Sequence, residues 1–186
     1  MKPSHYGIGF IGEGKYKLSD KGVFTPAGVC WKSIIERCYS PRRINKYPTY
    51  SECTLHPDWH NFQNFAEWYY TNHIEGYHLD KDLLVYGNTV YGAETCVFVT
   101  RHLNNLFIKE SKGAAYLTKV GHYSSCVNVN GESVYLGTFN TKSGAMSAYR
   151  KAKSEEIIRQ AYLPTTPHKL IKPLLSRAHS LSQFAS

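Results

Sequence analysis

The chain has 186 residues, which is enough for one medium domain or two small ones, each with a real hydrophobic core. Hydrophobic residues make up 42% of the sequence and aromatic residues 14%, which excludes a wholly disordered chain. No run approaches the roughly eighteen apolar residues that span a bilayer, and the N-terminus has no apolar stretch of signal-peptide length. We therefore expect an intracellular protein that is neither secreted nor embedded in a membrane.

The charge balance points to a polyanionic partner. The chain has 22 Lys and Arg against 14 Asp and Glu, a formal net charge of +8. A basic surface favours nucleic acid as the partner, although many basic proteins are merely soluble. The five cysteines are widely spaced and form no CxxC pair, so the sequence predicts neither a disulfide framework nor a zinc ribbon.

The first half of the chain begins with a glycine-rich arm, residues 1–24, which we expect to be extended or to form an edge hairpin. Thr25-Pro26 is typical of a helix start, and apolar residues at helical spacing predict a helix that ends before Ser40-Pro41. Basic residues gather at the exit of this helix: Arg37, Arg42, Arg43 and Lys46. They could suit the C-terminal end of the helix dipole, or they could bind phosphates.

A second helix is predicted after Asp58, a plausible N-cap. Its apolar face consists of Trp59, Phe62, Phe65, Ala66 and Tyr69. Such a stripe is more typical of a core than of a base-stacking platform.

Residues 76–108 are the most informative stretch. HLDKDLLVY predicts a strand, GNTVYGAET a loop, CVFV a second strand and TRHLNNLF a short helix. Strand, loop, strand and helix in this order form a ββα metal finger. In such a finger, one ligand leaves the first strand and another lies in the helix, and Asp80 and Asn104 fall at these places.

The last part of the chain predicts a second module over residues 117–162, after a linker at 109–116. Asn130-Gly131 is the strongest short hairpin signal, and Thr141 caps a helix with Ala145, Ala148, Tyr149 and Ala152 on one face. The tail, residues 163–186, is expected to be flexible, or a docking arm with an amphipathic piece near 170–175. The predicted fold class is α+β: an N-terminal helical region with a ββα finger, then a three-stranded antiparallel sheet packed on one helix.

Two family resemblances rest on these blocks. Residues 26–108 resemble phage-encoded HNH-type homing endonucleases, through WKSIIERCY, YSECTLHPDWHNFQNFAEWY and LDKDLLVYGNTVY followed by TC-x-FV-x4-N. Residues 117–152, with YLGTFNTKSGAMSAY, are similar to the ethylene-response-factor-type DNA-binding domain, which is also appended to HNH homing endonucleases. Together they imply a site-preferring endonuclease that hydrolyses phosphodiester bonds of duplex DNA in the host cytoplasm, at the nucleoid.

The nuclease resemblance implies a divalent metal held by Asp80 and Asn104, and these oxygen ligands favour Mg²⁺ or Mn²⁺ over zinc. Asn88 matches the asparagine that orders the loop of the finger. Lys81 stands where a histidine would deprotonate the attacking water. A lysine is a poor base at neutral pH but could stabilise the phosphate in the transition state.

Other residues could complete such a catalytic site. Asp82 could add a ligand beside Asp80, because the two would point the same way in a strand, and His78 and His102 are the nearest replacement bases. Each residue also has a simpler interpretation. Both aspartates could be solvated strand ends, Asn88 a turn residue, and His102 a surface histidine.

In the second module, the sheet face opposite the helix should meet DNA. We expect Ser125, Val127, Val129, Leu136 and Phe139 to face the helix. The outward set is Ser124, Cys126, Asn128, Ser133 and Tyr135, with Lys119 and His122 at the edge. This face has few of the arginines and tryptophans that the family presents, so weak, shape-based recognition or a mere packing role is expected.

Two rival functions stay open at this point. The first is a catalytically inactive, HNH-derived DNA-binding protein that acts as a regulator or inhibitor, because the base histidine is missing. The second is an interaction module whose basic faces contact an acidic host protein. A homodimer is possible under each of these functions, including the endonuclease.

Overall fold

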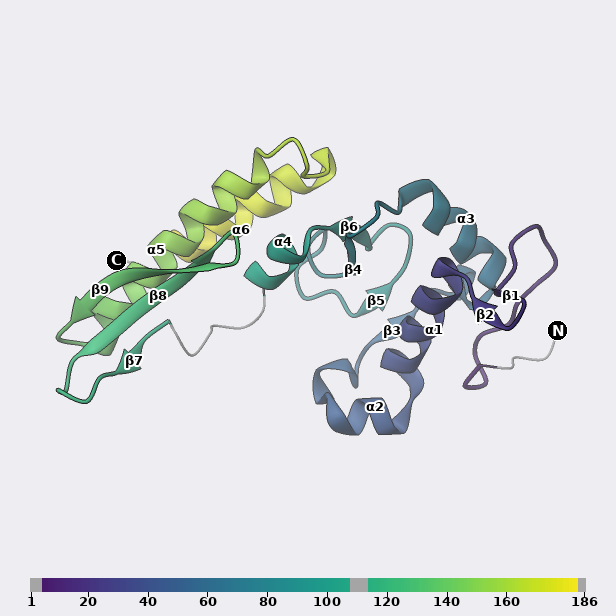
Figure 1. Cartoon of the computed structure of the whole chain (residues 1–186), viewed down its shortest axis with the longest axis horizontal. Coiled ribbons are helices and arrows are strands. Elements are labelled where there is room, and N and C mark those ends of the chain that lie inside the picture. Colours follow the sequence, from purple (N-terminus) through teal and green to yellow (C-terminus); the bar gives the residue numbers. More distant parts are fainter. Residues whose placement is uncertain (1–4, 108–113, 184–186) are drawn as a thin grey trace. The chain divides into compact units, whose positions relative to one another are not determined.

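The computed structural model describes residues 5–107 and 114–183. The chain, drawn in Figure 1, divides into two compact units, Met1–Phe98 and Val99–Ser186. Each unit has a hydrophobic cluster of its own. The predicted first domain, residues 25–108, therefore ends earlier, and its last helix belongs to the second unit. Helices and small, mostly antiparallel sheets occur together, which confirms the α+β fold class. Among the described residues, no helix is long and apolar enough to cross a membrane.

The first unit is built around two helices that pack on each other, α1 (Pro26–Tyr39) and α3 (Phe62–Asn72). Small strands and turns surround them. The other elements are β1 (Ser19–Asp20), β2 (Val23–Phe24), α2 (Pro41–Lys46), η1 (Pro48–Tyr50), β3 (Thr54–Leu55), η2 (Pro57–His60), β4 (His78–Asp80), β5 (Val90–Tyr91) and β6 (Val97–Val99). Strands β1 and β2 form an antiparallel hairpin, β3 pairs with β5 in parallel, and β4 pairs with β6.

Local capping explains where the two main helices begin. The Thr25 side chain accepts a hydrogen bond from Gly28 N at 3.1 Å, which confirms the predicted start of α1. The predicted cap of α3 was wrong. Asp58 lies in the 3₁₀ turn η2, and Asn61 caps α3 by accepting from Gln63 N at 3.0 Å.

Aromatic side chains fill the core of the first unit. Trp31 of α1 is fully buried and donates from Nε1 to Trp59 O at 2.7 Å. The Trp31 ring lies edge-on to Phe62 of α3, and Trp59 lies edge-on to Phe65. The apolar face predicted for the second helix is therefore core, as its pattern indicated.

The N-terminal segment is not a free arm over residues 5–24. Gln63 is 9% exposed, accepts from Tyr16 N at 3.0 Å and donates to Tyr16 O at 2.9 Å. Phe10 exchanges backbone hydrogen bonds with His60 and Phe62. A Cβ added at Gly9 would lie 2.7 Å from Ile35 Cδ1, so only glycine allows this close approach to α1.

The second unit places a sheet and a helix on opposite sides of one long helix, α5 (Lys142–Ala161). Its other elements are α4 (Arg101–Leu106), β7 (Tyr116–Leu117), β8 (Tyr123–Val129), β9 (Glu132–Phe139), η3 (His168–Leu170) and α6 (Ile171–Gln183). Strands β7, β8 and β9 form the predicted three-stranded antiparallel sheet. Thr141 caps α5 as expected, and Asn130 and Gly131 turn the hairpin with positive φ at both positions.

A β-bulge shapes the middle of this sheet. Ser125 is paired with Gly137 and Cys126 with Tyr135, which leaves Leu136 as the extra residue of β9. Gly137 has φ +125°, a conformation that a residue with a Cβ rarely adopts. The bulge turns Leu136 toward α5, where it packs beside Val127 and Tyr149 as the sequence predicted.

Two segments expected to lack structure are ordered in the second unit. Of the predicted linker 109–116, residues 109–113 lie outside the described residues, and Ala114 is buried against Val127 and Tyr149. The predicted flexible tail forms η3 and α6 up to residue 183, and Figure 1 shows α6 running alongside α5. Leu170, Leu174 and Ala178 bury one face of this segment.

Candidate functional site

The loop that follows β4 carries the residues expected to perform chemistry. Asp80 Oδ1 accepts hydrogen bonds from Asp82 N and Leu83 N, both at 2.7 Å. A side chain that binds the backbone two and three residues ahead makes a turn, so the strand predicted over residues 78–86 ends at Asp80. Asp82 lies in this turn, and the prediction that both aspartates share one strand face was wrong.

Asn88 closes the loop on itself. Its Nδ2 donates to Lys81 O at 2.8 Å and to Val90 O at 2.7 Å, and its Oδ1 accepts from Val90 N at 3.2 Å. These contacts orient the backbone on both sides of the loop, the role that the nuclease resemblance implies for this asparagine. The predicted loop also contains a short strand, β5, which the sequence pattern did not indicate.

The Lys81 side chain, only 12% exposed, turns into the loop. Its Nζ donates to Asn88 O at 2.8 Å and forms an ion pair with Asp82 Oδ1. An ammonium group held between a carboxylate and a carbonyl is a donor and cannot accept a proton from water. In this arrangement, Lys81 Nζ serves as a hydrogen-bond donor within the loop.

The same contacts test whether Asp80 and Asp82 could share a cation. One oxygen of Asp80 already accepts two backbone N–H groups, and one oxygen of Asp82 binds the Lys81 ammonium. Burial raises the pKa of the Asp80 carboxyl, although its two backbone hydrogen bonds oppose the shift. A shared Mg²⁺ or Mn²⁺ ion would therefore have to bind through the other oxygen of each carboxylate.

The other expected ligand and bases are placed as follows. His78 is exposed at the start of β4. Asn104 lies on α4, a helix capped by the Thr100 side chain, which accepts from Leu103 N at 3.2 Å. Asp80 and Asn104 belong to different compact units. Among the described residues, no group of three His, Cys, Asp or Glu side chains could hold a metal ion.

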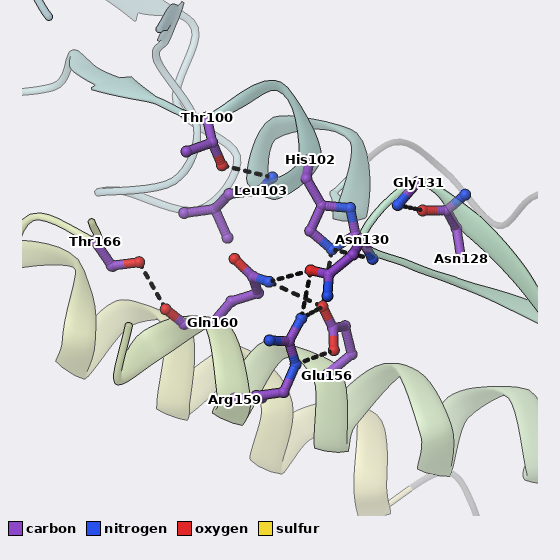
Figure 2. Close-up of polar contacts among 10 residues, drawn as sticks. All are labelled: Thr100, His102, Leu103, Asn128, Asn130, Gly131, Glu156, Arg159, Gln160 and Thr166. Atoms are coloured by element: carbon purple, nitrogen blue, oxygen red, sulfur yellow. Dashed lines mark hydrogen bonds and ion pairs between the residues drawn. The ribbon is translucent and has the colours of Figure 1, made fainter. Parts of the chain in front are cut away.

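His102 is not a surface histidine, because its side chain is only 17% exposed and contacts α5. Its Nε2 lies 2.8 Å from Glu156 Oε1 of α5, and the Glu156 side chain is 4% exposed (Figure 2). Arg159 donates to the same carboxylate from Nε at 2.7 Å and from Nη2 at 2.6 Å, and Gln160 Nε2 donates at 3.0 Å. His102 therefore joins α4 to α5, and its role as a replacement base stays a prediction.

The hydrogen bonds around Glu156 also set its charge. Burial alone would raise the pKa of Glu156, but hydrogen bonds from Arg159, His102 and Gln160 outweigh it and lower the pKa. The network extends to the hairpin turn, since Arg159 Nη2 donates to Asn130 Oδ1 at 2.7 Å (Figure 2). Sequence patterns gave no sign of this network, because its members lie far apart in the chain.

The outer face of the sheet in the second unit keeps only part of the predicted DNA-reading set. Tyr135 is 59% exposed, and its hydroxyl lies 2.5 Å from Thr138 Oγ1. Asn128 is exposed, but its Oδ1 accepts from Gly131 N at 2.9 Å and so stabilises the hairpin turn. Ser124 is buried beside Thr138, which excludes it as a reader of base edges. Lys119 and His122 are exposed in the turn before β8.

The basic residues after α1 in the first unit are accessible. Arg42 and Lys46 are exposed on the short helix α2, and Arg43 is half-buried with its guanidinium 5.1 Å from the centre of the Tyr47 ring. In the part of the chain that the structure describes, none of the three forms an ion pair with a carboxylate. Their charge is therefore available to an external anion.

Comparisons with known proteins add no relative: no family model, curated protein or solved structure matches the chain significantly.

Proposed function

We propose that this chain is a duplex-DNA-binding protein that uses an HNH-like scaffold without cleaving its substrate. The observation that carries the proposal is Lys81, whose ammonium is held by Asp82 and Asn88 at the position where the resemblance implies a catalytic base. The formal net charge of +8 and the unpaired cations of α2 supply the attraction to phosphates. Such a protein would act as a regulator or inhibitor by occupying DNA.

Metal-dependent hydrolysis of DNA is the second candidate, with Mg²⁺ or Mn²⁺ as the expected cofactor. The contacts of Asn88 favour it, because they hold the loop as the nuclease resemblance implies. They act on the shape of the loop, however, and supply no base. Binding is therefore the better supported of the two functions.

One pair of assays separates these functions. A labelled duplex should shift in a native gel in the presence of EDTA, and supercoiled plasmid should stay intact after incubation with Mg²⁺ or Mn²⁺. Nicking that requires either metal would establish the nuclease instead. A chain that neither shifts nor nicks DNA would contradict both proposals and would favour the acidic protein partner.

A further inference from the structure

Cations and tyrosine rings lie in one row across the first unit, from α2 to the loop after β4. Lys46 Nζ lies 5.4 Å and the Arg43 guanidinium 5.1 Å from the centre of the Tyr47 ring. The Tyr47 ring meets the Tyr50 ring edge-on at 6.4 Å, and the Arg37 guanidinium lies 5.9 Å from Tyr50. We call this row of residues, together with its inner end described next, the cation–tyrosine strip.

The inner end of the strip reaches the HNH-like loop. Arg37 hydrogen-bonds the side chain of Tyr91, and Lys81 Nζ lies 5.8 Å from the centre of the same ring. Burial raises the pKa of the Tyr91 hydroxyl, so this phenol stays neutral and does not balance the charge of Arg37. The strip therefore joins the basic exit of α1 to the residue that replaces the catalytic histidine.

The positive charge of the strip is mostly uncompensated. Among the described residues, Asp82 is the one carboxylate paired with it, and it binds Lys81 alone. The Nε atoms of Arg37 and Arg43 are both shielded from solvent and have no hydrogen-bond partner in the described part of the chain. No internal anion neutralises the two guanidinium groups among the described residues, so their charge is available to an external anion.

The residue types indicate which anion the strip suits. Arginine presents a planar fork that matches phosphate oxygens and stacks on aromatic rings, so it is common where proteins bind nucleic-acid backbones. A simple structural role for cation–ring contacts is weaker, since each contributes only about 0.5–1 kcal/mol at an exposed site. A structural role also does not explain why so few carboxylates pair with this row of cations.

We infer that the cation–tyrosine strip is the surface of the first unit on which the phosphate backbone of duplex DNA lies. Lys46 and Arg43, at the exposed end, contact phosphates directly. Arg37, at the inner end, adds an uncompensated charge that attracts the same strand. The inference rests on the proposed DNA-binding function and deepens it, because it assigns the contact to one row of residues.

The test measures how affinity depends on salt, using the full chain and a labelled duplex of about 20 base pairs of mixed sequence in EDTA. Each phosphate contact contributes about −0.9 to the slope of log K against log salt. We expect a slope of about −4 to −5 for the unchanged chain, which corresponds to about five contacts. Lys46→Gln and Arg43→Gln should each lower its magnitude by about 0.9 and weaken binding about eightfold near 0.1 M salt.

Matched controls remove the same charge from paired lysines in the same unit. Lys15 and Lys17 are exposed and form ion pairs with Glu67 and Asp20 at 3.1 and 3.0 Å. Lys15→Gln and Lys17→Gln should therefore leave the slope almost unchanged. Lys46 is exposed, so its substitution should not affect folding. Arg37→Lys, which keeps the positive charge, should keep an affinity for DNA that Arg37→Gln loses.

The outcomes separate this inference from the function on which it rests. A steep slope that Lys46→Gln and Arg43→Gln leave unchanged, or reduce no more than the two controls, overturns the strip while the DNA-binding function stands. An unchanged chain that fails to bind duplex at low salt overturns both.

Discussion

His102 Nε2 and Glu156 Oε1 lie 2.8 Å apart and connect the short helix α4 to the long helix α5, although 54 positions separate them in the sequence (Figure 2). Glu156 receives this bond in a site that is 4% exposed, where Arg159 and Gln160 also donate to it. The pair makes α4 part of the second unit. The sequence pattern instead placed α4 before the linker at residues 109–116. The sequence around α4 does not reveal that His102 contacts a residue as distant as Glu156.

Replacing the buried carboxylate should destabilise the second unit. We expect Glu156→Gln to lower the free energy of unfolding by about 2 kcal/mol, because hydrogen bonds from charged donors are lost inside the protein. Glu155→Gln, on the exposed side of the same helix, is the matched control and should have little effect. All three tryptophans lie in the first unit, so the urea midpoint of their fluorescence transition should be the same as in the unchanged chain. The midpoint of the second-unit transition, followed by circular dichroism, should fall. Equal stability of the two variants would contradict the role of Glu156.

The stability of the second unit should fall in acid. The pKa of Glu156 is lower in the folded chain than in the unfolded one, so its contribution is complete above the unfolded pKa, near 4.3. It is lost as the pH falls from about 5 through the folded pKa, because protonation then favours the unfolded chain. Unfolding by urea at a series of pH values, followed by circular dichroism, should show this loss in the unchanged chain and a smaller one in Glu156→Gln. Identical pH profiles would be inconsistent with it.

Asp80 should behave as a turn-forming residue that carries a costly charge. Burial raises the pKa of its carboxyl in the folded chain, so the ionised form lowers stability above that pKa. Asp80→Asn keeps an oxygen for Asp82 N and Leu83 N, and we expect stability at pH 7 that is unchanged or slightly higher. Asp80→Ala removes both hydrogen bonds and should cost about 1 kcal/mol. Tryptophan fluorescence in urea measures both, and a larger loss in the asparagine variant would show that the charge itself is required.

Substitution of Lys81 tests whether the loop after β4 can support hydrolysis of DNA. We expect no nicking of supercoiled plasmid by the unchanged chain with Mg²⁺ or Mn²⁺, since Lys81 is held as a hydrogen-bond donor. Lys81→His places an acceptor nitrogen where the resemblance implies a base, and we expect it to introduce nicking that requires one of these metals. The double variant that also carries Asp80→Ala is the control and should be inactive. Nicking by the unchanged chain would be decisive for the nuclease, and a loss of about a hundredfold in Lys81→Ala would then assign Lys81 to the transition state.

The C-terminal helix should be needed for the second unit to fold. Leu174 of α6 is 1% exposed, and we expect Leu174→Ala to cost about 2–5 kcal/mol, the range for truncating a buried leucine. Ser176→Ala, on the exposed side of the same helix, should be close to neutral. Thermal unfolding followed by circular dichroism compares the two. Similar midpoints would mean that α6 detaches in solution.

Local signals in the sequence predicted the elements whose causes are local. The Thr25 cap, the Asn130-Gly131 turn and the Thr141 cap each depend on neighbouring residues, and each is confirmed. Helix α6 was predicted only as a short amphipathic piece near residues 170–175 of an otherwise flexible tail, and Pro173 lies in its first turn. Proline is tolerated in the first turn, since the N–H groups there have no partner within the helix.

The candidate site was harder to predict, because the role of each side chain depends on its hydrogen-bond partners in the folded chain. The sequence predicted Asp80 and Lys81 in a strand and Asn88 in the loop that follows, whereas the structure ends the strand at Asp80 and brings Lys81 and Asn88 into contact. Which acceptor each donor binds depends on contacts in the folded structure. There, the Lys81 side chain points into the loop and binds Asp82, and His102 binds Glu156. The apolar and glycine patterns that locate strands carry no information about such choices.

Helix α5 buries polar side chains between the sheet and α6: Lys153, Ser154, Glu156 and Gln160 are each less than 9% exposed. Apolar surfaces can slide past each other by one helical turn, about 5.4 Å, and still find contacts. Here such a displacement of α5 would separate Ser154 Oγ from Ala178 O, now 2.8 Å away, and Glu156 Oε1 from His102 Nε2 of α4. Directional bonds thus fix a single register of α5 against its neighbours, which apolar contacts alone would not do.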